Sequence, residues 1–397
     1  MKTGIVTSLL LLLALAPLAH GQARTTPPIT VNRGVQAPAV KSPEILADGR
    51  VTFRVGAPNA QTVVLGSEFI TQGNAIAVPP GDMTAGPLPE VKMVKGANGV
   101  WEGTTTERIR PGAYRYYFVI DGAVTLDPRN VDMSPQRANQ NSLLIVPGDF
   151  SEHRKVPHGS VLQQSFVSST FGGIERPLVI YTPPGYDKGK GTYPVLYLMH
   201  GGGDHESSWV TNARANDILD NLIADKKAVP MIVVLPNGRA GKDLSPRDPI
   251  PKQVPAFAAF EKDLLVDLIP FVEKTYPVKS ERESRALAGL SMGGGQSLNI
   301  GLSHLNTFAW VGGFSSAPNT KKADELVNDS SSVAKRLRLL WLSCGDKDGL
   351  MGISRGFHES LEAKNVPHIW HIHTDGGHDF TVWKIDLHHF APLLFRE

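Results

Sequence analysis

The 397-residue chain is long enough for two domains, and 40 Lys and Arg nearly balance 38 Asp and Glu, leaving a net charge of +2. This balance excludes the strong positive field with which proteins attract nucleic acid or an anionic membrane surface. A single cysteine, Cys344, excludes an internal disulfide, so a hydrophobic core must stabilise the fold by itself.

Residues 1–21 have the pattern of a secretory signal peptide. A lysine precedes an apolar run from Ile5 to Leu18, and the small residues Ala19 and Gly21 fit positions −3 and −1 before the cleavage site. An uncleaved membrane anchor is the alternative, but the apolar run is short for a spanning helix. We therefore expect a secreted or periplasmic protein with no membrane contact after cleavage.

A short linker and a β-domain are predicted next. Residues 22–42 are rich in Pro, Thr, Val and Ala without helical periodicity and indicate a linker. Residues 43–146 contain alternating runs such as "RVTFRVGAP" and "YRYYFVIDG", in which Asp121-Gly122 is a hairpin signal. Several short strands with frequent turns predict a small immunoglobulin-like β-sandwich.

Residues 147–158 are interpreted as a second linker, after which the pattern changes. Over 159–397, continuous apolar runs such as "YPVLYLMHGGG", "MIVVLPNG" and "SRALAGLS" alternate with helical stretches such as "FEKDLLVDLIPFVEKTY". This alternation predicts a mostly parallel sheet flanked by helices on both faces. In such folds ligands bind at the carboxyl ends of the strands.

Ser291 stands at one of these strand ends, between Gly289 and Gly293 in "GLSMG". The G-x-S-x-G pattern between a strand and a helix is the nucleophile elbow of α/β-hydrolases. A plain glycine turn would match the five residues alone. The strand "RALAGL" before them and the helical "GGGQSLNIGLSH" after them favour a nucleophile.

A serine hydroxyl needs a general base, and in α/β-hydrolases the chain order is Ser, acid, His. His378 lies in the loop "DGGHDF" after the last strand-like run, so we predict it as the base. His371 and His373 alternate along that run and could chelate a metal, but we expect ordinary strand side chains and no metal site.

The acid should follow the preceding run, "LRLLWLSCGDKD", where Asp346 and Asp348 both qualify by position. A carboxylate beside the imidazole fixes its tautomer and stabilises the imidazolium, so one aspartate should point inward. Position alone leaves the choice open. Cys344, at the end of the apolar run, is expected to be a buried, inert thiol.

Backbone donors for an oxyanion are predicted at two places. The "HGGG" sequence at 200–203 matches the oxyanion loop of esterases, with Gly202 or a neighbour as one donor. Met292, directly after the nucleophile, supplies the other N–H.

Several motifs together resemble one family. "YPVLYLMHGGGDHESSWV", "AGLSMGGGQSLNIGL", "SAPNT", "GDKDGLMG" and "GGHDFTVWK" make the stretch from Ser165 to Phe395 similar to the esterase D-like feruloyl esterases of carbohydrate esterase family one. In that family the acid is the last Asp of a G-x-x-D loop and the base is the His of "GGHDF". The resemblance thus implies Asp348, rather than Asp346, as the acid and His378 as the base.

The resemblance also implies an activity. It predicts a serine esterase of the α/β-hydrolase fold that releases feruloyl groups from plant cell-wall xylan through an acyl-enzyme, without a metal or organic cofactor. The expected partners are feruloylated or acetylated xylan and its oligosaccharides. An acetylxylan esterase and a siderophore esterase of the enterochelin type are alternatives, and a non-catalytic carbohydrate-binding protein is an alternative of another class.

The N-terminal region resembles the carbohydrate-binding β-sandwich found ahead of glycogen-branching enzymes, on "GVWEG", "RPGAYRYYFVIDG" and "DPRN". Trp101 and Tyr116 could stack on sugar rings, but aromatic residues of a sandwich are more often buried, and we expect burial. If this domain only binds glycan, its removal should leave the hydrolysis of small soluble esters intact.

Two features bear on substrate choice. Trp209, after the oxyanion loop, is predicted either to contact a phenolic ring or to belong to the core. The stretch Pro236–Phe257 is long for a connection and follows a central strand, which is typical of substrate-contacting loops.

Overall fold

The computed structural model describes residues 40–68, 90–136, 139–186, 191–239 and 248–396, all of which lie in the unit Pro38–Glu397. The predicted signal peptide and nearly all of the 22–42 linker lie outside the described residues. Within these ranges, no helix combines the length and apolarity that crossing a bilayer would require.

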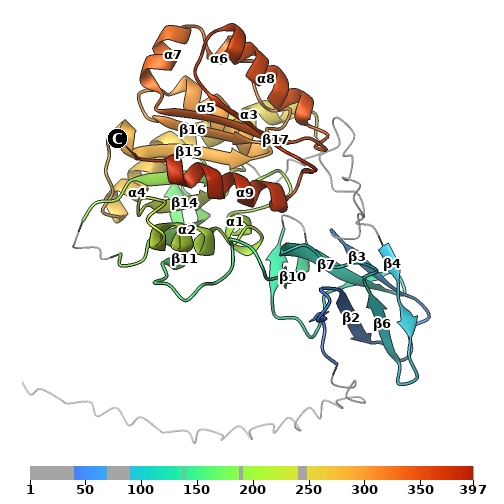
Figure 1. The fold of residues 1–397 in the computed structure, drawn as a ribbon. Helices are drawn as coiled ribbons and strands as arrows, with labels where there is room; N and C mark the ends of the chain where they lie inside the picture. Colours follow the sequence, from blue (N-terminus) through green and yellow to red (C-terminus); the bar gives the residue numbers. More distant parts are fainter. Residues whose placement is uncertain (1–39, 69–89, 137–138, 187–190, 240–247, 397) are drawn as a thin grey trace, which may run out of the picture. The chain divides into compact units, whose positions relative to one another are not determined.

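Two antiparallel sheets form the N-terminal region (Figure 1). The first has the order β1-β2-β6-β5, with β1 Glu44–Ile45, β2 Val51–Gly56, β6 Val100–Thr104 and β5 Val94–Lys95. The second has the order β4-β3-β7-β10-β9, with β4 Glu90–Lys92, β3 Val63–Ser67, β7 Gly112–Ile120, β10 Gln140–Val146 and β9 Met133–Pro135, and β8 Ala123–Thr125 pairs with β7. The predicted hairpin is present, since β7 and β8 flank Asp121-Gly122 and both turn residues have positive φ.

A hydrophobic core lies between these sheets, as the predicted sandwich requires. It contains alternate residues of β2, such as Phe53, and of β7, such as Phe118. Trp101 and Tyr116 belong to the same core, and the Tyr116 hydroxyl donates to Asp127 Oδ2 at 2.8 Å. Neither ring offers a stacking face to a sugar, so the expected burial of both is confirmed.

An eight-stranded sheet dominates the rest of the chain, in the order β11-β12-β14-β13-β15-β16-β17-β18. The strands are β11 Ser160–Ser168, β12 Ile174–Thr182, β14 Ile232–Pro236, β13 Val195–Met199, β15 Arg285–Leu290, β16 Trp310–Phe314, β17 Leu339–Gly345 and β18 Ile369–His373. The pairs β11–β12 and β12–β14 are antiparallel and the others are parallel. The predicted fold, a mostly parallel sheet that follows a β-sandwich in the chain, is confirmed. The sequence did not reveal β11, because its side chains are mostly exposed and form no apolar run.

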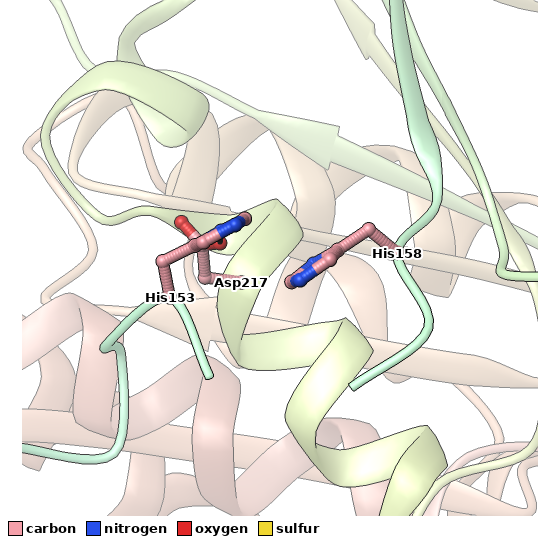
Figure 2. A group of neighbouring side chains, drawn as sticks. All are labelled: His153, His158 and Asp217. Atoms are coloured by element: carbon pink, nitrogen blue, oxygen red, sulfur yellow. Dashed lines mark hydrogen bonds and ion pairs between the residues drawn. The ribbon is translucent and has the colours of Figure 1, made fainter. Parts of the chain in front are cut away.

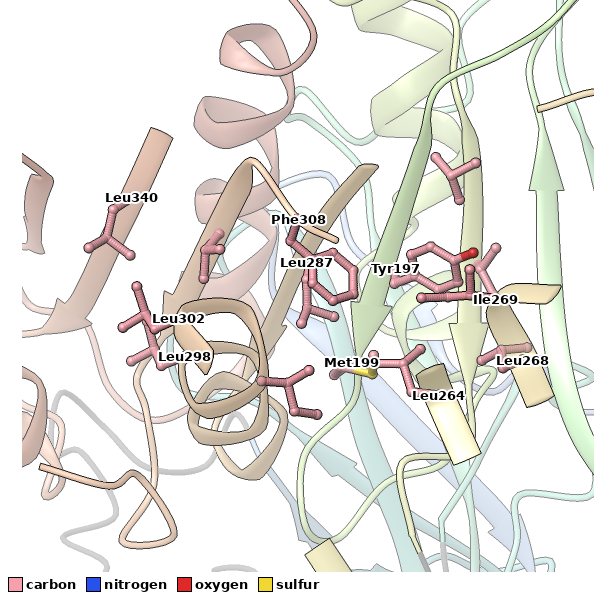
Figure 3. Packing of buried hydrophobic residues seen from close by; sticks show 14 of the residues in the cluster. Tyr197, Met199, Leu264, Leu268, Ile269, Leu287, Leu298, Leu302, Phe308 and Leu340 are labelled. Carbon is pink, nitrogen blue, oxygen red and sulfur yellow. The ribbon is translucent and has the colours of Figure 1, made fainter. Parts of the chain in front are cut away.

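Helices cover both faces of this sheet (Figure 1). Along β13, Tyr197 and Met199 face one cluster while Leu196 and Leu198 face the other. The first cluster, drawn in Figure 3, packs against α3 Ile250–Asp263, the π-helical turn Leu264–Leu268, α4 Ile269–Thr275, α5 Met292–Ser303, α6 Ala323–Leu326, α7 Ser330–Arg336 and α8 Met351–Ala363. The second packs against α1 Ser208–Thr211, α2 Ala215–Ala224 and α9 Phe380–Phe390. Strands buried on both faces explain the continuous apolar runs in the sequence.

The long loop predicted at 236–257 ends earlier than expected. Its last eight residues, from Ile250 onward, form the start of α3. A proline near the helix start, Pro251, costs no hydrogen bond there, because the first N–H groups of a helix have no intrahelical acceptor. Residues 240–247 of the predicted loop lie outside the described residues.

The packing predicts a large cost for truncating Leu287, a fully buried residue of β15 in the first cluster. Leu287→Ala should lower the free energy of unfolding by about 2–5 kcal/mol, through lost burial and the cavity left behind. Val266→Ala, which truncates a half-exposed side chain on the same face, should change it by less than about 0.5 kcal/mol. Chemical denaturation of both variants measures the difference, and equal effects would contradict the described core.

Candidate active site

Ser291 forms a sharp turn between β15 and α5. Its backbone has φ 52° and ψ −117°, a conformation that side-chain-bearing residues rarely adopt and that persists only when the surroundings impose it. A Cβ on Gly289 would lie 2.6 Å from Met199 Cβ, and one on Gly293 would lie 2.6 Å from the carbonyl oxygen of His200. Both glycines are required because the end of β13 passes directly beside the elbow.

Backbone hydrogen bonds fix this turn. The Ser291 N–H donates to the Phe314 carbonyl at 2.8 Å, and the Ser291 carbonyl accepts from Ala317 N–H at 3.1 Å. Met292 is the first residue of α5, so its N–H has no acceptor within the helix and lies at the positive end of the helix dipole. The turn therefore combines an imposed serine conformation with a free backbone donor next to it.

Three predicted residues from separate loops meet here. Ser291 Oγ lies 2.9 Å from His378 Nε2, and His378 Nδ1 lies 2.8 Å from Asp348 Oδ2. The arrangement is that of a nucleophile, a general base and an orienting acid within hydrogen-bond reach of one another.

The structure distinguishes the two candidate acids. Asp348 has a fully buried side chain, whereas Asp346 is exposed to solvent. Burial alone would raise the pKa of Asp348, but the hydrogen bonds from His378 and from the Leu350 N–H outweigh it, and the pKa is lowered. Asp348 therefore stays ionised beside the imidazole, which favours a proton on Nδ1 and leaves Nε2 to face the serine.

The start of α9 positions His378. Asp379, the N-cap of this helix, accepts from the backbone N–H of Thr381 at 2.8 Å and of Val382 at 3.3 Å. Trp383, in the first turn of the helix, packs perpendicular to the His378 ring, with the centroids 4.9 Å apart and the planes at 88°. The capped helix end and the indole together restrict the imidazole to the side facing Ser291.

The predicted oxyanion loop lies against the nucleophile. A Cβ built on Gly201 would lie 3.4 Å from Ser291 Cβ, so the backbone of this loop borders the serine side chain. Gly202 follows directly, and its carbonyl oxygen accepts a hydrogen bond from Arg239. The Gly201 carbonyl oxygen, in the same trans peptide group as the Gly202 N–H, accepts from His200 Nδ1 and from the Asp204 N–H. The Gly202 N–H therefore points to the opposite side, as a candidate donor to an oxyanion.

His200 connects this loop to the segment after β14. The Gly238 N–H donates to His200 Nε2 at 3.0 Å, and Nδ1 lies 2.8 Å from the Gly201 carbonyl oxygen. Burial lowers the pKa of His200 to about 4, and the nearby Arg239 guanidinium acts in the same direction. The ring is therefore neutral near pH 7, carries its proton on Nδ1 and holds the loop through one donated and one accepted hydrogen bond.

Trp209 belongs to the core. Its side chain is fully buried, its indole N–H donates to the Met199 carbonyl at 2.9 Å, and its ring packs edge-on against Phe380. No face of the ring can contact a substrate, so the core alternative is correct. The indole therefore packs against the start of α9, the segment that follows His378.

The other residues considered from the sequence, two histidines and the cysteine, have the packing contacts of structural residues. His373 Nε2 lies 2.7 Å from Asp386 Oδ1 in the buried space under α9, and His371 stacks on Trp341. Burial raises the pKa of Cys344 strongly, which keeps the thiol protonated and unreactive.

One group of side chains has the composition of a metal site. The side chains of His153, His158 and Asp217 offer ligand atoms within 4.8 Å of one another (Figure 2). The two imidazoles stack with centroids 4.0 Å apart and planes at 8°, so their lone pairs run in parallel planes and do not converge on one ion. Both nitrogens of His158 already have partners, Asp220 and the Arg154 carbonyl. The cluster is therefore better suited to attaching segment 147–158 to α2 than to binding a cation.

Residues 168–393 match the family described as putative esterases. The chain belongs to this family. The match confirms the predicted enzyme class, carboxylic ester hydrolysis.

Individual relatives agree with this assignment. The chain is 32% identical over 368 residues, 90% of its length, to a protein of Xylanibacter ruminicola named endo-1,4-beta-xylanase/feruloyl esterase, and it spans 46% of that protein. It is similar to the solved ferulic acid esterase of the anaerobic fungus Anaeromyces mucronatus, with 26% identity, a TM-score of 0.56 and coverage of 63% of this chain and 96% of the other. The enterobactin esterase of Shigella flexneri shares the fold, with 18% identity, a TM-score of 0.59 and coverage of 86% of this chain and 92% of the other.

Sequence reasoning did not identify several residues that hold the site. His200 was recognised only as part of the oxyanion motif, and Trp383 only as part of the family motif "GGHDFTVWK". Arg115 and Asp204 were not singled out, although Asp204 follows the oxyanion glycines directly. No local pattern connects a strand arginine with an aspartate 89 residues later.

The neutral His200 predicts a pH effect on stability. Because its pKa is about 4 in the folded chain and about 6.5 when unfolded, only the unfolded chain gains a proton as pH falls from 6.5 towards 4, and stability is lost in that window. Wild type should lose about 2 kcal/mol more unfolding free energy between pH 7 and 5 than His200→Gln, which cannot titrate there. Urea unfolding at both pH values measures this, and parallel losses would refute a neutral, buried His200.

Proposed function

We propose that this chain is an exported serine esterase that hydrolyses hydroxycinnamoyl esters, such as feruloyl esters, on plant cell-wall xylan. The observation that carries the proposal is the hydrogen-bonded series Ser291, His378 and Asp348 beside the oxyanion loop. The sequence of residues 1–21 supports export, to the periplasm or the medium.

The geometry supports a two-step acyl transfer. His378 Nε2 takes the proton of Ser291 Oγ while the oxygen attacks the ester carbonyl carbon, and the N–H groups of Gly202 and Met292 stabilise the oxyanion. When the intermediate collapses, the carbon–oxygen bond to the alcohol breaks and the alcohol leaves with the proton from Nε2. Water then repeats these steps on the acyl-enzyme, releasing the acid and restoring Ser291. No step requires a metal or an organic cofactor.

The substrate class rests on the relatives and on one feature of the surface. The Xylanibacter ruminicola protein is named for both xylanase and feruloyl esterase activity, and the fungal esterase has been solved with ferulic acid. An open cleft of about 520 Å³ borders the residues that follow the oxyanion loop, and Gln163, Gln164, His205 and Glu206 are among its lining side chains. Such amide, imidazole and carboxylate groups can hydrogen-bond the hydroxyls of a sugar chain that bears the ester.

A substrate profile tests the acyl group and the alcohol. The purified protein should hydrolyse methyl ferulate and release ferulate from feruloylated xylan oligosaccharides faster than it releases acetate from acetylated xylan or cleaves a ferric catecholate triester. Ser291→Ala should abolish hydrolysis and labelling by a fluorophosphonate. Preference for acetate or for the catecholate ester would replace the proposed substrate, while undiminished activity of Ser291→Ala would reject the mechanism.

Asp348 offers a second test, with Asp346 as the matched control two residues away. Asp348→Asn should lower kcat by about 10⁴-fold, because a neutral amide no longer favours the proton on Nδ1 of His378. Asp346→Asn changes an exposed carboxylate by the same chemistry, and its kcat should stay within about threefold of wild type. Steady-state kinetics on methyl ferulate compare the two, and the opposite ranking would overturn the assignment of the acid.

A further inference from the structure

A buried arginine of the β-sandwich contacts the catalytic loops. Arg115 lies on β7, where its neighbour Tyr116 points into the sandwich core. The Arg115 side chain is only 7% exposed, and one terminal nitrogen donates to Asp204 Oδ1 at 2.5 Å and to Asn212 Oδ1 at 3.3 Å. Asp204 directly follows the oxyanion glycines, and Asn212 caps the end of α1.

The rest of the guanidinium is held within the sandwich. Arg115 Nε donates to Ser134 Oγ at 2.9 Å, and the other terminal nitrogen lies 3.5 Å from Glu68 Oε1. Glu68 Oε2 also accepts from the Arg115 backbone N–H at 2.8 Å. Each guanidinium nitrogen thus has a partner, which fixes both the position and the orientation of the fork.

Asp204 transmits this position to the oxyanion loop. Its backbone N–H donates to the Gly201 carbonyl at 3.3 Å, which closes the turn that contains Gly202. Its second carboxylate oxygen lies 3.4 Å from the Cβ position of Gly201, the residue that borders Ser291. Movement of the Asp204 carboxylate would therefore move the peptide that carries the proposed oxyanion donor.

The same guanidinium also reaches the loop of the base. Arg115 Cζ lies 5.5 Å from the ring centroid of Phe380, two residues after His378. One side chain from the N-terminal region thus contacts both segments that flank the serine.

The energetics favour a role in geometry over a role in stability. The side chains of Arg115 and Asp204 are both less than a tenth exposed, so each charge has lost most of its hydration. A buried ion pair repays that cost only partly and is weak evidence for stability, but it strongly disfavours arrangements that leave either charge unpaired. Such a pair selects one position of the oxyanion loop.

We infer that Arg115 is a positioning residue for ester hydrolysis, which holds the Gly202 N–H in place through Asp204. This inference rests on the proposed function, because it assigns to Arg115 a part in stabilising the same oxyanion. It also changes the expectation for the sandwich, whose removal should impair hydrolysis even of small soluble esters.

The test compares Arg115→Met with Arg54→Met in the full-length chain. Arg54 is a matched control, since it also lies in the sandwich and pairs with two carboxylates, Glu44 and Glu102, but both of its partners are in the same sheet. With active sites counted by fluorophosphonate titration, Arg115→Met should lower kcat on methyl ferulate by about 10- to 100-fold, with KM within about threefold. Arg54→Met should keep the wild-type kcat.

Two further measurements separate positioning from folding. The rate of phosphonylation should fall by the same factor as kcat, because that reaction also places negative charge in the oxyanion site. Loss of folded protein would not change the rate per titrated site.

Asp204→Asn should show a similar loss of kcat. The double variant should lose no more than the larger single loss, because both residues act through one contact. If Arg115→Met does not fold, Arg115→Lys replaces it, since one ammonium nitrogen cannot serve Ser134, Glu68 and Asp204 in the directions of the three guanidinium nitrogens.

The outcomes are distinguishable. Wild-type kcat per titrated site in Arg115→Met or its lysine replacement, with Ser291→Ala inactive, would overturn the role of Arg115 and leave the proposed function intact. A wild type without esterase activity, or an active Ser291→Ala, would overturn the proposed function and this inference with it.

Discussion

The site depends on the close approach of two neighbouring parallel strands, β13 and β15. Where they end, Gly293 comes so near the His200 carbonyl that no side chain fits between them. This approach places the oxyanion loop, which continues β13, beside the serine that continues β15. Ser291 turns the chain sharply from β15 into α5, and hydrogen bonds to the Phe314 carbonyl and from the Ala317 N–H hold its positive φ. The sheet therefore places the Ser291 hydroxyl and the Met292 N–H, whereas the position of the Gly202 N–H also depends on the Arg115–Asp204 contact.

Around the serine, hydrogen bonds and burial determine which side chains are charged and which ring nitrogens carry protons. The lowered pKa of Asp348 keeps a negative charge next to His378 Nδ1, and the lowered pKa of His200 keeps a neutral ring under the oxyanion loop. Burial acts in opposite directions on the two pKa values, raising that of Asp348 and lowering that of His200. In Asp348 the partners outweigh the burial, whereas in His200 burial and a neighbouring cation act together. Of these two buried side chains, which follow β17 and β13 of the same sheet, Asp348 is thus charged and His200 neutral.

Much of this could be predicted from the sequence, because the signals are local. Apolar runs revealed most strands of the large sheet, and glycines at fixed spacing revealed the elbow and the oxyanion loop. The choice between Asp346 and Asp348 came from family resemblance, since both follow the strand and only three-dimensional packing buries one of them. β11 was not predicted because its exposed side chains carry no apolar pattern. Arg115 could not be predicted, because its role comes from a contact between distant segments that no spacing rule encodes.

The Arg115–Asp204 contact has a consequence for anyone who wishes to graft this catalytic region onto another enzyme. Segment 147–158 is the obvious place to cut, since it joins the sandwich to β11 without strands of its own. A cut there would leave the Asp204 carboxylate without its cation and open to water that now has access to the oxyanion turn. The smallest transplantable piece is therefore the whole described unit, and a shorter graft would need a replacement cation for Asp204.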